Sequence, residues 1–216
     1  MDLREAIRTT GSVREFRDEA VADALVASVL DDARFAPSGG NRQPWRVALV
    51  KDAAIRRQLA ALMQPVWDEY VAASRTGAAP FNAVDYRPPA QRMHASNSLL
   101  DGIERVPAVL AVAADLRRIS AMDAALDRIS VVPGASIYPF CWNVLLAARD
   151  RGLGGVLTTF LSRVEREAAP LLKLPEHHAL AATIFLGYPV HQPTRLRRKP
   201  VEEFASVDAF EGVPLA

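Results

Sequence analysis

Small polar and basic residues gather in three separate segments of the chain, and their types suit a phosphorylated, flat ligand. Ser12 and Arg14 lie in the first segment, the run 36–45 (APSGGNRQPW) is the second, and the basic stretch 195–199 (RLRRK) is the third. A phosphate monoester is highly charged and needs several converging cations or hydrogen-bond donors. The three segments therefore predict an anion site that is assembled from distant parts of the chain.

The run 36–45 has the composition of a loop that faces a ligand. Its proline break, glycine pair, Asn41 and Trp45 disfavour both helix and strand. A fused heteroaromatic ring needs amide donors and flat packing surfaces, and the backbone of such a loop can supply the amides. Together with a phosphate site, this loop indicates a mononucleotide such as FMN rather than a dinucleotide. Gln43 and Trp45 are interpreted as structural, whereas Asn41 has two readings, a ligand contact or a contact within its own loop.

Regular elements on both sides of these segments must hold them in place. The apolar spacing predicts helices after the caps Asp2 and Asp52, at 23–35 and 137–149, and after a capping box of Ser162 and Glu165. Apolar runs predict strands at 47–50, 107–114 and 179–186. The segment 65–105 has scattered prolines and no clear period, so we expect short helices and loops that form a lid. These elements predict an α+β fold with helices around a small, mostly antiparallel central sheet.

Composition and charge exclude several classes of protein. Half of the 216 residues are hydrophobic, 24% are charged, and the formal net charge is +1, which gives no reason to expect nucleic acid or an acidic membrane as partner. The N-terminus lacks the apolar core of a signal peptide, so a cytoplasmic location is the expectation. Cys141 is the single cysteine and is interpreted as a buried thiol. His177 and His178 are adjacent and have no acidic partner at ligand spacing, so we expect no metal site.

In their order along the chain, the motifs resemble the nitroreductase family of FMN-dependent oxidoreductases. The motifs are Ser12-x-Arg14-x-Phe16, the run APSGGNRQPW, Ala147-Ala148-Arg149-x-x-Gly152-Leu153-Gly154, Gly187-Tyr188-Pro189 and Arg198-Lys199-Pro200. The APSxxNxQPW element is highly specific, whereas the last two elements count because they occur in the right order. The resemblance covers nearly the whole chain apart from 65–105.

The resemblance implies an architecture as well as a cofactor. FMN would be held without a covalent bond at the interface of a homodimer. Residues 1–190 would form the FMN-binding domain, with 65–105 as a variable insert, and residues 191–216 would be an arm that wraps around the partner subunit.

The resemblance also implies which residues contact FMN. Ser12, Val13 and Arg14 match the segment that binds the phosphate and the pyrimidine edge of the ring. Arg198 matches a late phosphate ligand, with Arg195 and Arg197 as helpers. Backbone amides at Thr158 and Thr159 would lie near flavin N5. The remaining contacts near the ring would come from Ser38, Gly39 and Asn41 and from Pro133, Gly134, Ala135 and Ser136.

One position departs from the family pattern. Many members carry an arginine two residues before the serine of the first motif, where this chain has Thr10. A phosphate ligand is then missing, and either Arg8 or the basic stretch 195–199 would have to compensate.

The implied reaction is hydride transfer from NADH or NADPH to flavin N5, followed by reduction of a nitroaromatic, quinone or related acceptor in a ping-pong sequence. No catalytic side chain is assigned, although Arg14 would stabilise the anionic reduced flavin. Two alternatives stay open at this point. One is a protein that stores or sequesters FMN, and the other is a specialised member that destroys its own flavin or removes halogen from an aromatic ring.

Overall fold

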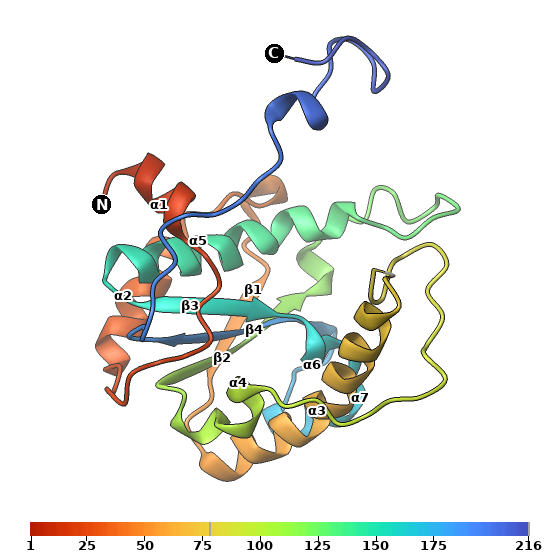
Figure 1. Cartoon of the computed structure of the whole chain (residues 1–216). Coiled ribbons are helices and arrows are strands. Elements are labelled where there is room, and N and C mark those ends of the chain that lie inside the picture. The colour runs from red at the N-terminus through yellow and green to blue at the C-terminus, as the bar shows by residue number, and fades with distance from the viewer. Residues whose placement is uncertain (78, 216) are drawn as a thin grey trace.

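Four strands pair into one antiparallel sheet in the computed structural model, which describes residues 1–77 and 79–215 (Figure 1). The strands are β1 (Trp45–Leu49), β2 (Ala108–Asp115), β3 (Gly154–Thr158) and β4 (His178–Gly187), in the order β1-β2-β4-β3. In the centre of the sheet, Leu110 of β2 lies between Leu49 of β1 and Ile184 of β4. Because both faces of β2 are covered, all eight of its residues are buried, which explains its unbroken apolar run. The predicted α+β class and antiparallel sheet are confirmed.

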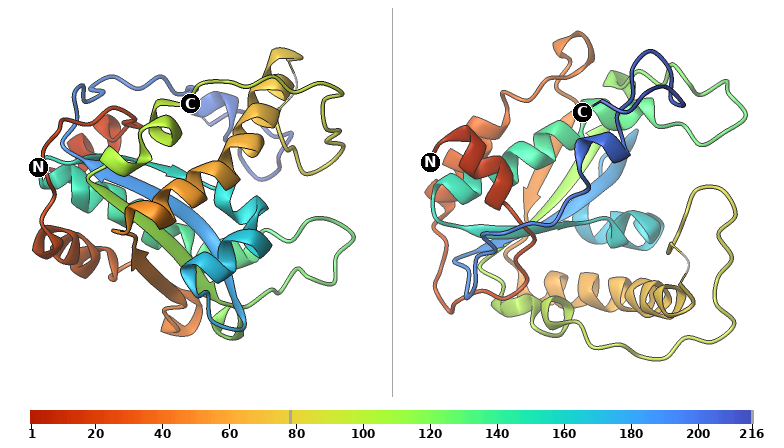
Figure 2. Two further views of the ribbon diagram at one scale, coloured as in Figure 1. Left: turned by 90° about the horizontal axis from the view of Figure 1, so that it is seen from below. Right: turned by 45° about the horizontal axis from the view of Figure 1, so that its top comes forward.

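Helices cover both faces of the sheet, and alternate residues of β2 serve the two layers (Figures 1 and 2). Leu110 and Val112 pack in the core beneath α2 (Asp23–Ala33) and α5 (Tyr138–Asp150). Val109 and its odd-numbered neighbours pack in the opposite core. That core is covered by α3 (Ala53–Arg75), α4 (Ser98–Asp101), α6 (Phe160–Arg163) and α7 (Glu165–Leu172). The strand period of two therefore divides one strand between two cores.

Local capping chemistry sets several helix ends as predicted. Asp2 accepts a hydrogen bond from the Glu5 amide at 2.8 Å at the start of α1 (Leu3–Thr9). Asp52 accepts one from the Ile55 amide at 2.9 Å at the start of α3. Gly152 follows α5 with a φ of +76°, a conformation that glycine adopts without strain. Short 3-10 turns occupy Gly39–Asn41, Ile103–Arg105, Leu116–Arg118, Val132–Ser136 and Val201–Glu203.

The expectation for the start of the segment 65–105 is wrong. Instead of breaking up at Pro65, α3 continues through it to Arg75. Proline removes one backbone donor and disfavours a helix interior, but Val66, Glu69 and Ala73 are buried against the rest of the molecule. Tertiary packing of this face therefore overrides the local effect of proline. Residues 79–97, which lead to α4, form no helix or strand, as expected.

The capping box predicted for α7 is also wrong. Ser162 lies inside α6, and α7 starts after Val164 without a side-chain cap. The Glu165 carboxylate instead accepts a hydrogen bond from the Leu180 amide of β4. The Glu165 carboxylate, which the local pattern assigned to the helix start, therefore makes a tertiary contact with β4.

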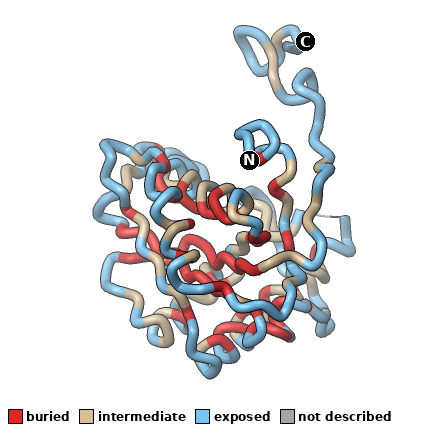
Figure 3. Tube along the Cα trace, turned by 90° about the vertical axis from the view of Figure 1, so that its left-hand side faces the viewer, coloured by how far each residue is buried: buried red, intermediate tan, exposed pale blue. Residues whose placement is uncertain are grey.

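The C-terminal segment runs away from the sheet and is mostly exposed (Figure 3). Its aromatic side chains Phe204 and Phe210 have little contact with the rest of the chain, since Phe204 is 69% exposed. Among the described helices, none has the length and apolar character that crossing a membrane requires. Cys141 is buried in α5, as predicted, and burial raises the pKa of its thiol to about 12.

Candidate functional site

A pocket of about 460 Å³ opens beside the C-terminal end of β3. It is lined by three distant parts of the chain, which are Arg14, the segment 156–160, and a wall made by α3 with the residues just before and at the start of α4. Arg14, Thr158 and Thr159, which were predicted to lie near one ligand, do line the same pocket. The lining residues that were not predicted from the sequence are Trp67, Tyr70, Ser96, Asn97, Ser98, Leu99, Val156, Leu157 and Phe160.

The backbone of β3 places Arg14 at this pocket. Val13 is 3% exposed and its amide donates to the Gly155 carbonyl at 2.9 Å, so the segment 12–14 lies along β3. A Cβ on Gly154 would meet Val13 Cγ2 at 2.7 Å, and only glycine therefore allows this close approach. Since neighbours in extended backbone point to opposite sides, burial of Val13 leaves Ser12 and Arg14 exposed.

The charge of Arg14 is not neutralised by a neighbour. No ion pair to Arg14 occurs within residues 1–77 and 79–215, although Glu15 and Asp18 are close in sequence. A free guanidinium that lines a pocket can donate to an anionic or carbonyl edge of a ligand.

Thr158 and Thr159 supply polar groups at the end of the sheet. The hydroxyl oxygen of Thr158 is buried and has no hydrogen-bond partner among the described atoms. Such an orphan group is costly unless a ligand or water satisfies it. Thr159 is exposed at the start of α6. The pocket lining thus combines two threonines with an arginine that is unpaired within the described part of the chain.

Aromatic side chains form part of the pocket wall. Trp67 and Tyr70, one helical turn apart on α3, stack with ring centroids 5.7 Å apart and an interplanar angle of 10°. The ring of Phe160 meets both of them edge-on, at 5.8 and 5.9 Å. The spacing of Trp67 and Tyr70 was the only signal in the sequence that could have indicated this wall.

A second group of predicted residues lies elsewhere on the molecule. The Gly39 amide donates to Ser136 Oγ at 3.1 Å, so the loop 38–41 and the turn 133–136 meet. They border a separate pocket of about 410 Å³, whose lining includes Ser38, Gly39, Ala135 and Ser136. Within the described residues, this pocket shares no lining side chain with the pocket at β3.

The loop 36–45 also contains the internal contacts that were expected of it. The Asn41 side-chain oxygen accepts from Gln43 Nε2 at 3.2 Å, and the Gln43 amide donates to Ser38 Oγ at 3.0 Å. Trp45 stacks on Phe140 with ring centroids 4.8 Å apart. Gln43 and Trp45 therefore stabilise the loop, as predicted, and Asn41 makes a contact within it.

The late arginines lie next to the first helix. A pocket of about 570 Å³ is lined by Arg8, Arg195 and Arg198 together with three uncharged residues, whereas Arg197 does not line it. Thr10 is buried and donates its hydroxyl to the Ala6 carbonyl at 2.7 Å. Its side chain is therefore committed to α1 and is not directed to a ligand.

Comparisons with known proteins agree with one another. Residues 7–188 match the model of the Nitroreductase family. An "NADH dehydrogenase" of Thermus thermophilus is 28% identical over 213 residues, which cover 94% of each chain.

Two solved structures of similar fold contain bound ligands. One is a Vibrio harveyi NADPH:FMN oxidoreductase complexed with NAD+, with a TM-score of 0.69 and 19% identity, covering 97% of this chain and 78% of the other. The other is an iodotyrosine deiodinase bound to FMN and 3-iodo-L-tyrosine, with a TM-score of 0.70 and 21% identity, covering 97% and 100%.

Proposed function

Because the chain belongs to the nitroreductase family, we propose that it is an FMN-dependent oxidoreductase that uses NADH or NADPH to reduce a nitroaromatic, a quinone or a related flat acceptor. The observation that carries the proposal is the convergence of Arg14, Thr158 and Thr159 on one pocket at the end of β3. Their chemistry matches a flat ring with carbonyl and amide edges.

The polar groups of the chain are of the kinds that the ring and the phosphate of FMN require. Arg14, Thr158 and Thr159 line the pocket that would take the ring. Exposed Ser12 is two residues away, and its neighbour Gly11 lies against the arm, since a Cβ there would meet Leu196 at 2.8 Å. Beyond it, the cationic pocket that includes Arg8 suits a phosphate.

The protein itself has a limited part in the proposed reaction. FMN, when bound, supplies the two-electron chemistry. Arg14 would orient the ring and hold a positive charge at its pyrimidine edge, which favours a negatively charged state of the ligand there. The aromatic wall of Trp67, Tyr70 and Phe160 would exclude water and offer a flat surface for the acceptor.

A homodimer is part of the proposal, because one subunit does not bring all the predicted contacts together. The patch formed by 38–41 and 133–136 is separate from the pocket at β3, and a second copy of the chain would place it over the ring. Exposed aromatic side chains on α5 and on the arm support such an interface, since Tyr138 is 44% and Trp142 40% exposed.

Anaerobic titration tests the proposal. We expect purified protein to be yellow, or to take up added FMN, and its flavin absorbance to bleach rapidly with NADH or NADPH. Well-folded protein that stays colourless with added FMN would refute the proposal. Flavin that is bound but not bleached by either nicotinamide would instead favour the storage role.

A further inference from the structure

The chain between α3 and α4 forms a strap along the aromatic wall of the pocket. We use the term strap for residues 80–97, which leave the end of α3 and return beside the same helix to α4 (Figures 1 and 2). The strap contains no helix or strand of its own, so its position depends on side-chain contacts.

A buried carboxylate on α3 fixes the strap to two helices. Glu69 is 3% exposed and accepts a hydrogen bond from the Tyr86 hydroxyl at 2.7 Å. Its other contacts are ion pairs with Arg92 of the strap and Arg163 of α6, both at 3.0 Å. Desolvation, together with the bond to Glu69, raises the pKa of Tyr86, so Tyr86 keeps the proton that it donates. Glu69 thus joins α3, α6 and the strap.

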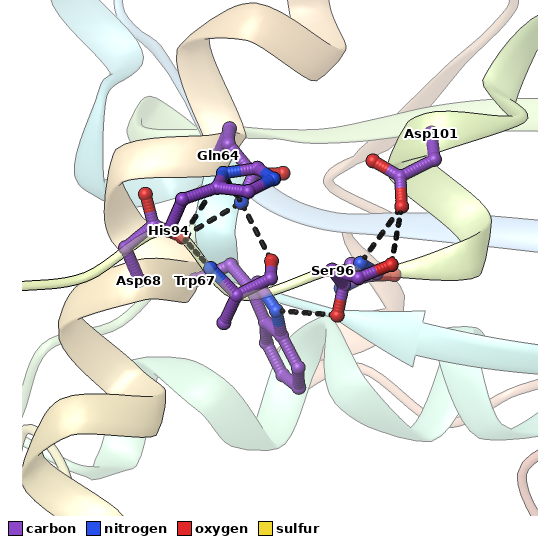
Figure 4. Close-up of polar contacts among 8 residues, drawn as sticks. Gln64, Trp67, Asp68, His94, Ser96 and Asp101 are labelled. Carbon is purple, nitrogen blue, oxygen red and sulfur yellow. Dashed lines mark hydrogen bonds and ion pairs between the residues drawn. The ribbon is translucent and has the colours of Figure 1, made fainter.

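The carboxylate that precedes Glu69 on α3 fixes the far end of the strap (Figure 4). Asp68 accepts from the Ala95 amide at 2.9 Å and from Gln64 Nε2 at 2.7 Å. Gln64 also donates to the Ala95 carbonyl at 2.9 Å. Trp67 Nε1 donates to the Ser96 carbonyl at 3.2 Å. Asp68 and Gln64 therefore hold the strap where it approaches the pocket.

The aromatic wall is built from the same elements that these carboxylates join. Trp67 and Tyr70 flank the two acidic residues on α3, and Phe160 comes from α6, three residues before Arg163. The Arg163 guanidinium also lies 4.5 Å from the centre of the Phe81 ring in the strap. A shift of α6 would therefore change the distances from Phe160 to the two rings on α3. A shift of the strap would disturb its contacts with Arg163 of α6 and with Trp67 Nε1.

We propose that Glu69 is a positioning residue for the acceptor, because it fixes α6 and the strap so that Trp67, Tyr70 and Phe160 form a ready-made surface for one flat ring before the acceptor arrives. The inference rests on the proposed function, which supplies the acceptor. Glu69 lines no part of the pocket, so it acts only through the residues that it holds.

Glu69→Gln tests the inference, because the amide keeps the shape of the side chain and removes its charge. With menadione as acceptor, we expect KM to rise about tenfold while kcat stays within about twofold, the pattern for lost acceptor binding. Flavin content and the rate of bleaching by the nicotinamide should not change. Trypsin should also cut the variant faster after Arg92, which is an ion-pair partner of Glu69 in the wild type.

Two further variants make the experiment decisive. Glu167→Gln removes an exposed carboxylate on α7 and should match the wild type in every measurement. Tyr86→Phe deletes one contact of Glu69 and should shift KM and trypsin cleavage in the same direction by a smaller factor. If Glu69→Gln does not fold, Tyr86→Phe decides alone.

The outcomes separate this inference from the proposed function. A yellow, reducible variant with unchanged acceptor KM would overturn the role of Glu69, even if trypsin cut the strap faster. A lower flavin content and a lower kcat together with a raised KM would also overturn it, because this combination indicates a general structural defect. Failure of the proposed function would appear in the wild type itself, as protein that neither binds FMN nor is bleached.

Discussion

Arg8 and Thr10 lie at the end of α1 and make different contacts. Thr10 uses its hydroxyl within the helix, whereas Arg8 lines a pocket with Arg195 and Arg198. The sequence left two alternatives for the missing phosphate ligand, Arg8 and the basic stretch 195–199. In the structure, Arg8 and two arginines of that stretch line the same pocket. Three arginines therefore line one pocket beside α1, and we propose that they supply the charge that the family pattern places two residues before Ser12.

Replacement of Arg8 by alanine should weaken the binding of FMN about tenfold, because a charge-assisted contact to the phosphate contributes on the order of 1.5 kcal/mol. Riboflavin lacks the phosphate and should bind the variant as well as it binds the wild type. Fluorescence titration with both ligands measures the ratio. Arg4→Ala, an exposed arginine of α1 outside the pocket, is the control. An equal loss for FMN and riboflavin would contradict a phosphate contact.

At the scale of elements, the loop 120–136 depends on one buried aspartate. Asp123 is 5% exposed and accepts from Ser130 Oγ at 2.5 Å, from the Val131 amide at 2.8 Å and from Arg128 Nη1 at 2.7 Å. These hydrogen bonds, that of Ser130 first, hold the pKa of Asp123 well below its usual range. The loop ends in the turn 133–136, so Asp123 helps to set the position of that part of the predicted cofactor site.

The protection of this loop should depend on pH in a defined direction. A carboxylate with a lowered pKa in the folded state stabilises it above the unfolded pKa of about 3.9, and this stabilisation is lost as the pH falls through the folded value. Asp123→Asn should therefore lower hydrogen-exchange protection of the Val131 amide at pH 7, and the difference from wild type should shrink at lower pH. Asp127→Asn, an exposed change in the same loop, should have no such effect. A difference that did not vary with pH would exclude the charge as the cause.

The elements that could be predicted from the sequence are those that local or periodic signals determine. Asp2 and Asp52 cap the helices that follow them, and the apolar run at 107–114 forms the central strand. The end of α3 could not be predicted, because Glu69 and its partners Arg92 and Arg163 meet only in the folded chain. For the same reason, the aromatic wall could not be predicted. Arg14 and Thr158 lie in sequence motifs and were predicted, whereas Trp67, Tyr70 and Phe160 come together only through tertiary contacts.

At the scale of the whole molecule, the predicted cofactor contacts lie on separate surfaces of one subunit. The pocket at β3 holds Arg14, while the patch around Gly39 and Ser136 belongs to another pocket. The exposed arm beyond residue 190 has almost no core contacts of its own (Figure 3). Both features are accounted for if two chains exchange arms and each completes the site of the other.

A heterodimer of two defective chains tests this arrangement directly. Arg14→Ala should impair the pocket at β3, and Gly39→Glu should impair the patch. The Gly39→Glu chain should still fold, because a Cβ at this position meets Ser136 Oγ at an ordinary 3.5 Å. Each homodimer would then have two defective sites, whereas the heterodimer would have one site with both defects and one intact site. Co-expression with two affinity tags isolates the heterodimer, and FMN titration should give about one tight site per pair, as two-fold symmetry requires. Absence of a tight site in a stable heterodimer would mean that Arg14 and the patch of the same subunit form one site. A wild type that is monomeric in sedimentation would refute the exchanged dimer.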